Sequence, residues 1–157
     1  APLGLGFGMA SGEKKLTPLA KFHEFCTRGV DDEVAAAIKG DSSLVTKSGE
    51  LGNTALHWAS SGGHSKVVTI LLDSKADVNS QNKVKDTPLH MAAWRDRVQV
   101  IKLLVEAGAD KTAKNQDGKV PLDLGRSTEA RDQLLAMSKG EAKQSIMLAA
   151  DEDDDTD

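Results

Sequence analysis

Three of the four histidines and the single cysteine are the residues of this chain best suited to catalysis or metal binding. His23, His57 and His90 lie 34 and 33 residues apart, and Cys26 follows His23 by three residues. A histidine and a cysteine at this spacing share one face of a helix, where they could act as metal ligands or as a nucleophile and its base. Two ligands do not complete a structural zinc site, and no Asp or Asn is placed to orient such a base. We therefore expect Cys26 to be a small buried side chain.

The regular spacing of the histidines indicates a repeated unit. The hexapeptide at 54–59 (TALHWA) recurs at 87–92 (TPLHMA), and the stretch 67–72 (VVTILL) recurs at 100–105 (VIKLLV), in both cases 33 residues later. Histidines of neighbouring stacked units would lie roughly 10 Å apart, the packing distance of adjacent helices, which is too far to share one metal ion. We therefore expect the histidines to have structural roles.

Each full unit is predicted to contain a turn, a short helix, a tight loop and a longer helix. In the second unit the first helix is expected at 55–62, with Thr54 as its N-cap, and the second helix at 65–74. Gly63 between them can take a left-handed conformation, and Asp96 replaces this glycine in the third unit. The apolar residues of the longer helices recur at helical spacing, so each unit must stack on its neighbours to bury them.

The first unit is a degenerate copy. Residues 17–19 (TPL) resemble the start of the repeated motif, but aligning His23 with His57 also matches Gly29 with Gly63. We therefore regard 17–19 as a decoy and place the start of the first unit near residue 16. Degeneracy is expected of a terminal unit that caps a stack.

The last unit is shorter and carries Asp123 where the others carry histidine. The distance from Leu122 to Leu135 is two residues less than the distance from Leu89 to Leu104, and the charged residues between them suit a polar outer face. We therefore predict four repeats, two regular and two capping. Their expected bounds are 16–48, 49–81, 82–114 and 115–137.

The residues outside the repeats differ in composition. Residues 1–15 contain four glycines and no periodicity, so we expect a flexible lead-in. Residues 138–150 are compatible with a partial helix, whereas 151–157 hold six acids and no base, which predicts a disordered tail. Residues 1–8 are either a cloning remnant before a start at Met9 or the end left after removal of an organelle-targeting segment.

Composition and charge exclude several classes of function. The formal net charge is −4, and without the six acids of the tail it is +2, so neither part has the Lys/Arg-rich face that nucleic acid requires. No run approaches the ~18 apolar residues of a membrane-spanning helix. The single cysteine excludes an internal disulfide and fits a reducing compartment. We expect a cytoplasmic protein, or one inside an organelle if Ala1 is a processed terminus.

No motif points to catalysis or to a cofactor. There is no Ser/His/Asp set and no pair of carboxylates that the repeat does not already explain. The Gly-rich stretch 4–8 lacks the Lys-Ser/Thr pair of a phosphate-binding loop and has no strand before it. We therefore expect a non-catalytic protein without a cofactor or a metal.

The 33-residue period and the Thr-Pro-Leu-His-x-Ala motif make residues 20–137 resemble an ankyrin-repeat domain. The resemblance implies an all-α solenoid of stacked helix-loop-helix units with β-turn fingers, in which each histidine bonds backbone groups across adjacent repeats. A closer resemblance is to the ankyrin region of the osteoclast-stimulating factor family, carried by 52–59 (GNTALHWA), 81–83 (QNK), 86–94 (DTPLHMAAW) and the acidic end. That family of cytoplasmic adaptors also has an SH3 domain, for which this chain has no room, so SH3-type binding is not implied.

In ankyrin folds the turn tips and one side of the first helices line a concave surface, and the resemblance implies that this surface binds proteins. Leu51, Val84 and Trp94 are apolar residues at positions that the frame does not need to bury. Trp and Arg are enriched among interface residues whose truncation costs ~2 kcal/mol or more. The alternative for Trp94 is half-covered surface packing, and we expect Trp58 to be structural. The predicted contact residues are Arg28, Glu50, Leu51, Asn53, Lys83, Val84, Asp86, Trp94, Arg95, Gln116, Asp117 and Lys119.

We therefore predict an adaptor that binds a protein partner through the concave surface, as a monomer or within a hetero-complex. The alternative is an organelle targeting or assembly factor that escorts a client protein. The acidic tail is expected either to solvate the chain, to contact a basic partner, or to fold back onto the concave surface.

Overall fold

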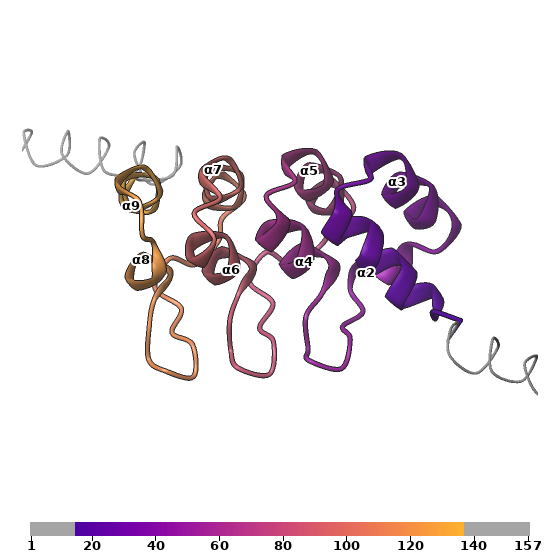
Figure 1. Cartoon of the computed structure of the whole chain (residues 1–157), viewed down its shortest axis with the longest axis horizontal. Coiled ribbons are helices and arrows are strands. Elements are labelled where there is room, and N and C mark those ends of the chain that lie inside the picture. Colours follow the sequence, from indigo (N-terminus) through magenta and orange to yellow (C-terminus); the bar gives the residue numbers. More distant parts are fainter. Residues whose placement is uncertain (1–14, 137–157) are drawn as a thin grey trace, which may run out of the picture.

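The computed structural model of the protein describes residues 15–136, which form eight α-helices, one 3-10 helix and no strand. Figure 1 shows the α-helices in two rows, with each successive pair stacked beside the one before it. The inner row contains α2 (Pro18–Arg28), α4 (Ala55–Gly62), α6 (Pro88–Trp94) and α8 (Pro121–Leu124). The outer row contains α3 (Asp31–Gly40), α5 (Ser65–Asp73), α7 (Val98–Glu106) and α9 (Thr128–Leu135). This arrangement confirms the predicted all-α solenoid.

Three loops, which we call fingers, extend along one edge of the inner row, at the bottom of Figure 1. Finger 1 is residues 46–54, finger 2 is 79–87 and finger 3 is 112–120. The predictions for residues 1–14 and 137–157, namely most of the lead-in, the partial helix and the acidic tail, lie outside the described residues.

Backbone hydrogen bonds join each finger to the next. The amide of Lys83 in finger 2 donates to the carbonyl of Leu51 in finger 1 at 3.1 Å, and the amide of Gln116 in finger 3 donates to the carbonyl of Val84 at 2.9 Å. The fingers therefore form one continuous edge, and their tips are held in a fixed arrangement.

The histidine of each regular repeat ties the start of its helix to the following finger. Nδ1 of His57 accepts the amide N–H of Thr54 at 3.1 Å, so Nε2 carries the ring proton and donates to the carbonyl of Asp86 at 2.8 Å. His90 repeats this arrangement with Thr87, at 3.1 Å, and with the carbonyl of Lys119, at 2.9 Å. The expected bonding across adjacent repeats is thus confirmed for these two rings.

The core runs along the whole stack between the two rows. Val34, Val68 and Ile101 occupy the same position in three successive outer helices, and all three are fully buried. Outer helices contact outer helices and inner helices contact inner helices of the neighbouring repeat. Each buried aliphatic side chain of this size contributes about 1.5–3 kcal/mol relative to exposure, so stacking supplies much of the stability.

The leucine that is buried in the last helix pair is not the one whose spacing we compared with that of Leu104. Leu134 is buried, at 4% exposure, whereas Leu135, which we aligned with Leu104, is 62% exposed. The reason is the short connection between α8 and α9. Gly125 is extended rather than left-handed, and Ser127 caps α9 through its side chain, which changes the register by one residue.

The helix-to-helix turns follow the sequence prediction. Gly29 and Gly63 adopt left-handed φ angles of 75° and 78°, and Asp96 takes the same conformation with φ of 53°. Residues 17–19 begin α2, because Thr17 caps the helix by accepting the amide of Ala20 at 3.1 Å, but the register of the repeat follows His23 and Gly29, as predicted. Ala20 stands three residues before His23, where the regular repeats have threonine. The first helix therefore begins about one turn earlier than α4 and α6 do.

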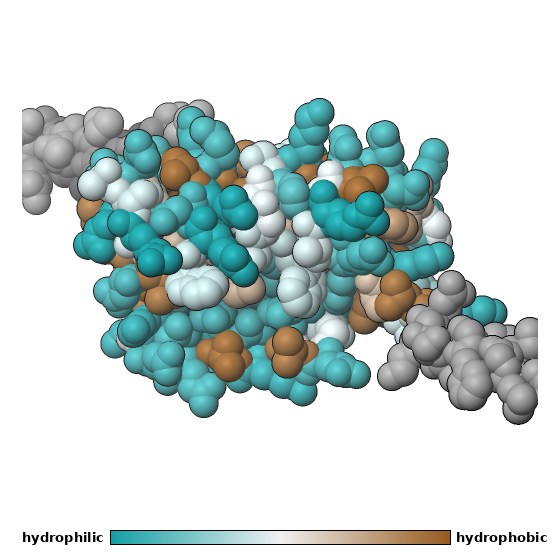
Figure 2. All heavy atoms as spheres, in the orientation of Figure 1, coloured by the Kyte–Doolittle hydropathy of each residue, from teal (hydrophilic) through white to brown (hydrophobic). Residues whose placement is uncertain are grey.

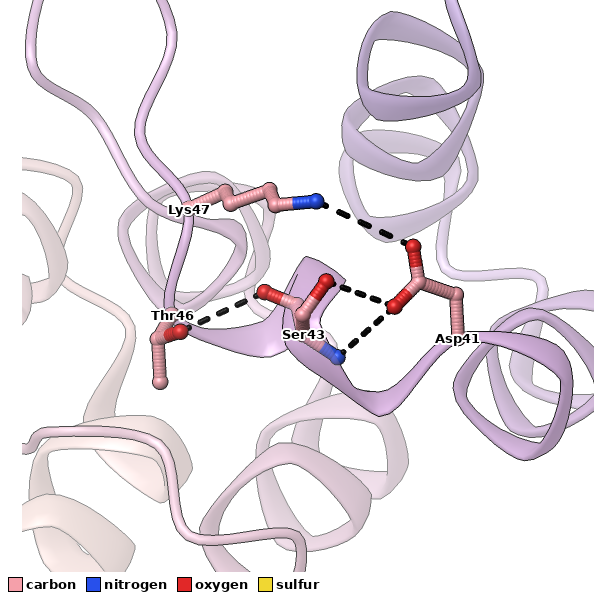
Figure 3. Close-up of polar contacts among 4 residues, drawn as sticks. All are labelled: Asp41, Ser43, Thr46 and Lys47. Atoms are coloured by element: carbon pink, nitrogen blue, oxygen red, sulfur yellow. Dashed lines mark hydrogen bonds and ion pairs between the residues drawn. The ribbon is translucent and has the colours of Figure 1, made fainter.

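The connection from α3 to finger 1 contains the 3-10 helix η1 (Ser42–Val45). Figure 3 shows how Asp41 starts it, by accepting the amide of Ser43 at 3.0 Å and its hydroxyl at 2.6 Å, while Lys47 lies 3.8 Å from the other carboxylate oxygen. These bonds from Ser43 hold the pKa of Asp41 below its usual range. Similar turns at Asp77 and Asp110 follow α5 and α7, so the same device directs the chain into each finger.

Candidate protein-binding surface

The inner-row helices and the three fingers together form a face that we call the inner surface, and it corresponds to the predicted concave surface. Two hollows lie on it. The first hollow, of about 370 Å³, lies between α2, finger 1 and Trp58 of α4. The second hollow, of about 390 Å³, lies between α6 and finger 3, with Ser61 and Leu124 at its edges.

The structure brings most of the predicted contact residues to one of these hollows. The first hollow is lined by Glu50, Leu51 and Asn53. The second hollow is lined by Asp86, Trp94, Arg95, Asp117 and Lys119. The remaining predicted residues line neither hollow and are exposed; they are Arg28, Lys83, Val84 and Gln116.

Exposed apolar side chains lie on this otherwise polar surface. Leu51 and Val84 hold the same position in fingers 1 and 2, and they are 65% and 47% exposed. Figure 2 shows two separate hydrophobic patches on the finger edge, surrounded by hydrophilic side chains. Because the carbonyls of both residues bond to the next finger, these side chains project from fixed backbone. Apolar groups presented rigidly in this way are typical of binding surfaces.

Trp94 and Arg95, at the C-terminal end of α6, place an aromatic ring and a positive charge on the inner surface. The ring of Trp94 is 54% exposed, and the Cζ atom of Arg95 lies 5.1 Å from its centroid. This cation–π contact orients both side chains beside the second hollow. The charged residues that line this hollow are balanced in number, two acidic (Asp86 and Asp117) and two basic (Arg95 and Lys119).

Two of the predicted contact residues that line the hollows also hold the frame together. Asn53 is buried, and its Oδ1 accepts from Nδ2 of Asn82 at 2.8 Å. Asp86 is half-buried, and its carboxylate accepts from Nδ2 of Asn115 at 3.0 Å in the same way. The polar groups of these two side chains therefore make hydrogen bonds between neighbouring fingers.

Comparison with known proteins agrees with this geometry. A family model described as ankyrin repeats (three copies) matches residues 16–115, which is more than half of the chain. The chain belongs to the ankyrin-repeat family. Ankyrin repeats are protein-binding modules and the family is generally non-catalytic.

Part of this ankyrin chain is similar to a proteasome regulatory subunit. Over 51 residues it is 41% identical to the 26S proteasome non-ATPase regulatory subunit 10 of Rattus norvegicus, which is 32% of this chain and 22% of that protein. The Homo sapiens protein of the same name is 39% identical over 51 residues, 23% of its length. The chain therefore spans less than a quarter of the relatives that it matches.

Three residues that line the hollows were not predicted as contacts. Each lies one residue after one of the ankyrin histidines. Glu24 and Trp58 line the first hollow, and Met91 lines the second. On the helices, the predicted contact residues lie only four and five residues after the histidines. Helical spacing would have found the others, because residues three to four positions apart lie on one face of a helix.

The first ankyrin histidine is not bonded like the other two. Nε2 of His23 has no hydrogen-bond partner, and neither has Nε1 of Trp58, although both atoms are buried. Burial lowers the pKa of His23, and a backbone hydrogen bond with Lys47 partly offsets this effect. His23 therefore does not repeat the Nε2 bond of His57 and His90, and Ala20 stands where the regular repeats have the threonine that bonds the ring.

The described residues offer little for other chemistry. Cys26 is fully buried, and burial raises the pKa of its thiol to about 12, so the reactive thiolate is not formed at neutral pH. Within residues 15–136, no three side chains of the metal-binding types gather at one point. In the same range, no helix combines the length and apolar character needed to cross a membrane.

Proposed function

We propose that this chain is a non-catalytic scaffold or adaptor that binds a protein partner through its inner surface. The observation that carries the proposal is the set of exposed apolar side chains, Leu51, Val84 and Trp94, on positions that the repeat leaves free. The frame around them is fixed by histidine, asparagine and finger-to-finger bonds. A rigid surface loses little conformational entropy on binding, which favours affinity.

The similarities support an adaptor role within a larger assembly. The motifs quoted above resemble the osteoclast-stimulating factor family, whose members are cytoplasmic adaptors. The matched relatives are named as a regulatory subunit of the 26S proteasome. We propose that this chain likewise works as one component of a hetero-complex in a reducing compartment such as the cytoplasm, which suits its single buried cysteine.

Affinity capture from a cell extract with the immobilised chain tests the proposal. Val84→Asp and Trp94→Ala change exposed residues of the inner surface, so we expect both variants to fold and to lose the partner. Leu135→Asp is the matched control, because Leu135 is equally exposed but lies on the outer helix α9. Capture that both inner-surface variants retain would show that the partner binds elsewhere.

A further inference from the structure

Two residues that line the first hollow, His23 and Trp58, each have a buried ring nitrogen atom without a hydrogen-bond partner. In the regular repeats, Nε2 of His57 and of His90 bonds the carbonyl of the following finger. The corresponding carbonyl in finger 1, that of Asn53, accepts the amide of Gly49 at 3.0 Å, but Nε2 of His23 does not reach it. Since His23 is 8% exposed and lines the hollow, the wall of this site includes a residue with an unused hydrogen-bonding group.

The state of the His23 ring determines what this group can bind. The ring makes a backbone hydrogen bond with Lys47 that raises its pKa, as expected when a ring N–H donates to a carbonyl. Because Nε2 has no partner, this bond uses Nδ1. Burial favours the neutral ring, in which Nε2 then carries a lone pair. The wall of the hollow therefore presents an acceptor, which requires a donor from the ligand.

The charge around the hollow favours a cation. Glu24 and Glu50 line the hollow and are exposed, and no Lys or Arg of the described residues lines it. The ion pair of Glu24 with Arg28 is long, at 3.4 Å, and both side chains are largely exposed, so it competes weakly. The second hollow differs, because its acidic and basic residues are equal in number.

The walls of the hollow suit the stem of a long side chain. Leu51, Ala20 and Trp58 provide apolar surface in the same hollow as the two glutamates. Arginine and lysine bury their methylene stems along such surface while the charged head group keeps polar partners. The planar guanidinium also stacks on aromatic rings, which favours arginine over lysine.

We propose that the first hollow binds an arginine side chain, or more weakly a lysine, from an extended segment of the partner protein. The head group donates to Nε2 of His23 and lies between the carboxylates of Glu24 and Glu50. The unpartnered indole N–H of Trp58 donates to a main-chain carbonyl of the same segment. This inference rests on the proposed function, and it adds the chemical nature of the residue that the partner contributes.

Nuclear magnetic resonance on the full ¹⁵N-labelled chain tests this proposal with capped tripeptides as probes. Ac-Ala-Arg-Ala-NH₂ is expected to shift the indole N–H signal of Trp58 saturably and to move the Nε2 signal of His23 toward a hydrogen-bonded value. The lysine peptide is expected to bind more weakly and the glutamate peptide not at all. Equal binding of the glutamate or a tyrosine peptide, or no saturable shift with arginine, would overturn the proposal. The Trp94→Phe variant identifies which of the two indole signals belongs to Trp58.

A charge-removing variant separates specific recognition from general attraction. Glu24→Gln combined with Glu50→Gln is expected to weaken the arginine peptide roughly ten-fold, because two exposed ion pairs are lost. Glu106→Gln combined with Glu129→Gln removes the same charge from exposed positions on α7 and α9 and is expected to change the affinity less than about two-fold. Equal weakening in both double variants would contradict a site in the first hollow.

The peptide experiment and the capture experiment fail independently. If the arginine peptide binds but the Val84→Asp and Trp94→Ala variants still capture the partner, the arginine site in the first hollow is supported and the proposed binding through the whole inner surface is wrong. If capture depends on Val84 and Trp94 but no peptide shifts Trp58, the proposed function stands and the arginine site is wrong.

Discussion

Individual histidines in this protein act as neutral hydrogen-bonding groups. Nδ1 of His57 faces the amide N–H of Thr54, so a proton added there would replace an accepted bond by two opposed donors. Burial also disfavours the charged ring, and the pKa of His57 is lowered for this reason first. The same cause lowers the pKa of His23. Protonation of these rings is therefore linked to unfolding.

The free energy of unfolding is expected to decrease as the pH is lowered through the range in which these two rings take up protons. Both pKa values lie below the ordinary 6.5, so the unfolded chain binds the protons first as the pH falls. The free energy of unfolding should be constant above pH about 6.5 and then decrease, by at most about 1.4 kcal/mol per pH unit for each ring. Urea unfolding between pH about 7.5 and about 5 measures this effect.

The variant His57→Gln provides the control for this dependence. It removes one of the two titrations, so its stability should be lower at neutral pH but should change less steeply with pH. Asp41, Asp96 and Asp110 also have lowered pKa values, but their ordinary value is 3.8. Their effect on the free energy of unfolding therefore appears at a lower pH than that of the histidines. Stability that rises as the pH falls from about 7 to about 5 would contradict the assignment of neutral rings.

At the scale of elements, the fingers depend on one left-handed position that recurs every 33 residues. Gly52, Lys85 and Gly118 occupy it, with φ of 77°, 62° and 74°. A Cβ atom on Gly52 would meet the backbone nitrogen of Lys83 at 2.8 Å, whereas a Cβ on Gly118 meets nothing within 4 Å. The first position therefore combines strain with close packing between fingers, and the last position has strain alone.

The comparison of Gly52→Ala with Gly118→Ala separates these two effects. Gly118→Ala should lower the free energy of unfolding by about 1 kcal/mol through left-handed strain. Gly52→Ala should cost about 3 kcal/mol, because finger 2 must also move away from finger 1. Urea unfolding of both variants measures the difference. Equal losses would show that the two fingers are not in close contact.

Asn82 is the side chain that organises finger 2. Its Nδ2 donates to Asn53 at 2.8 Å, and its Oδ1 accepts the amides of Val84 and Asp86 at 3.0 Å and 2.9 Å. Asn82→Ala should therefore cost about 2–3 kcal/mol and broaden the amide signals of finger 2 in a heteronuclear NMR spectrum. Asn79→Ala, which removes one exposed bond to Asp110, is a control expected to cost less than about 1 kcal/mol. Similar losses in both variants would contradict the organising role of Asn82.

Local patterns predicted the elements, whereas contacts between elements decided the exceptions. Thr54 and Gly63 act within a few residues of their own helix ends, so their roles could be deduced from the sequence. The burial of Asn53 depends on a residue 29 positions away in finger 2. The unpartnered state of His23 likewise depends on how α2 sits against finger 1. Such spacings are fixed by packing and have no local signature.

At the scale of the whole molecule, the main contacts among the described helices join each repeat to the repeats beside it. The contacts recorded between helices run from α2 to α4, α6 and α8 in one row and from α3 to α5, α7 and α9 in the other. In a stack of this kind, stability is approximately a sum over units and their interfaces. A destabilising substitution in a terminal repeat should therefore loosen that repeat and leave the distant repeats nearly unchanged.

Leu134→Ala is a test of this local behaviour. Leu134 is buried in α9, so its truncation should cost about 2–3 kcal/mol. Hydrogen exchange should become faster in α8 and α9 and remain nearly unchanged in α4 and α5. Leu71→Ala, in the central helix α5, is expected to accelerate exchange throughout the stack. Uniform acceleration by Leu134→Ala would contradict a sum of neighbouring interfaces.

The inner surface is the feature that gives this molecule its proposed function, and the affinity of a captured partner tests it most directly. Isothermal titration of that partner should give a Kd about 30-fold weaker for Trp94→Ala, with comparable weakening for Val84→Asp. Leu135→Asp, exposed on the outer helix α9, should change the Kd less than about two-fold. If both inner-surface variants bind as tightly as the unmodified chain while remaining folded, the inner surface is not where the partner binds.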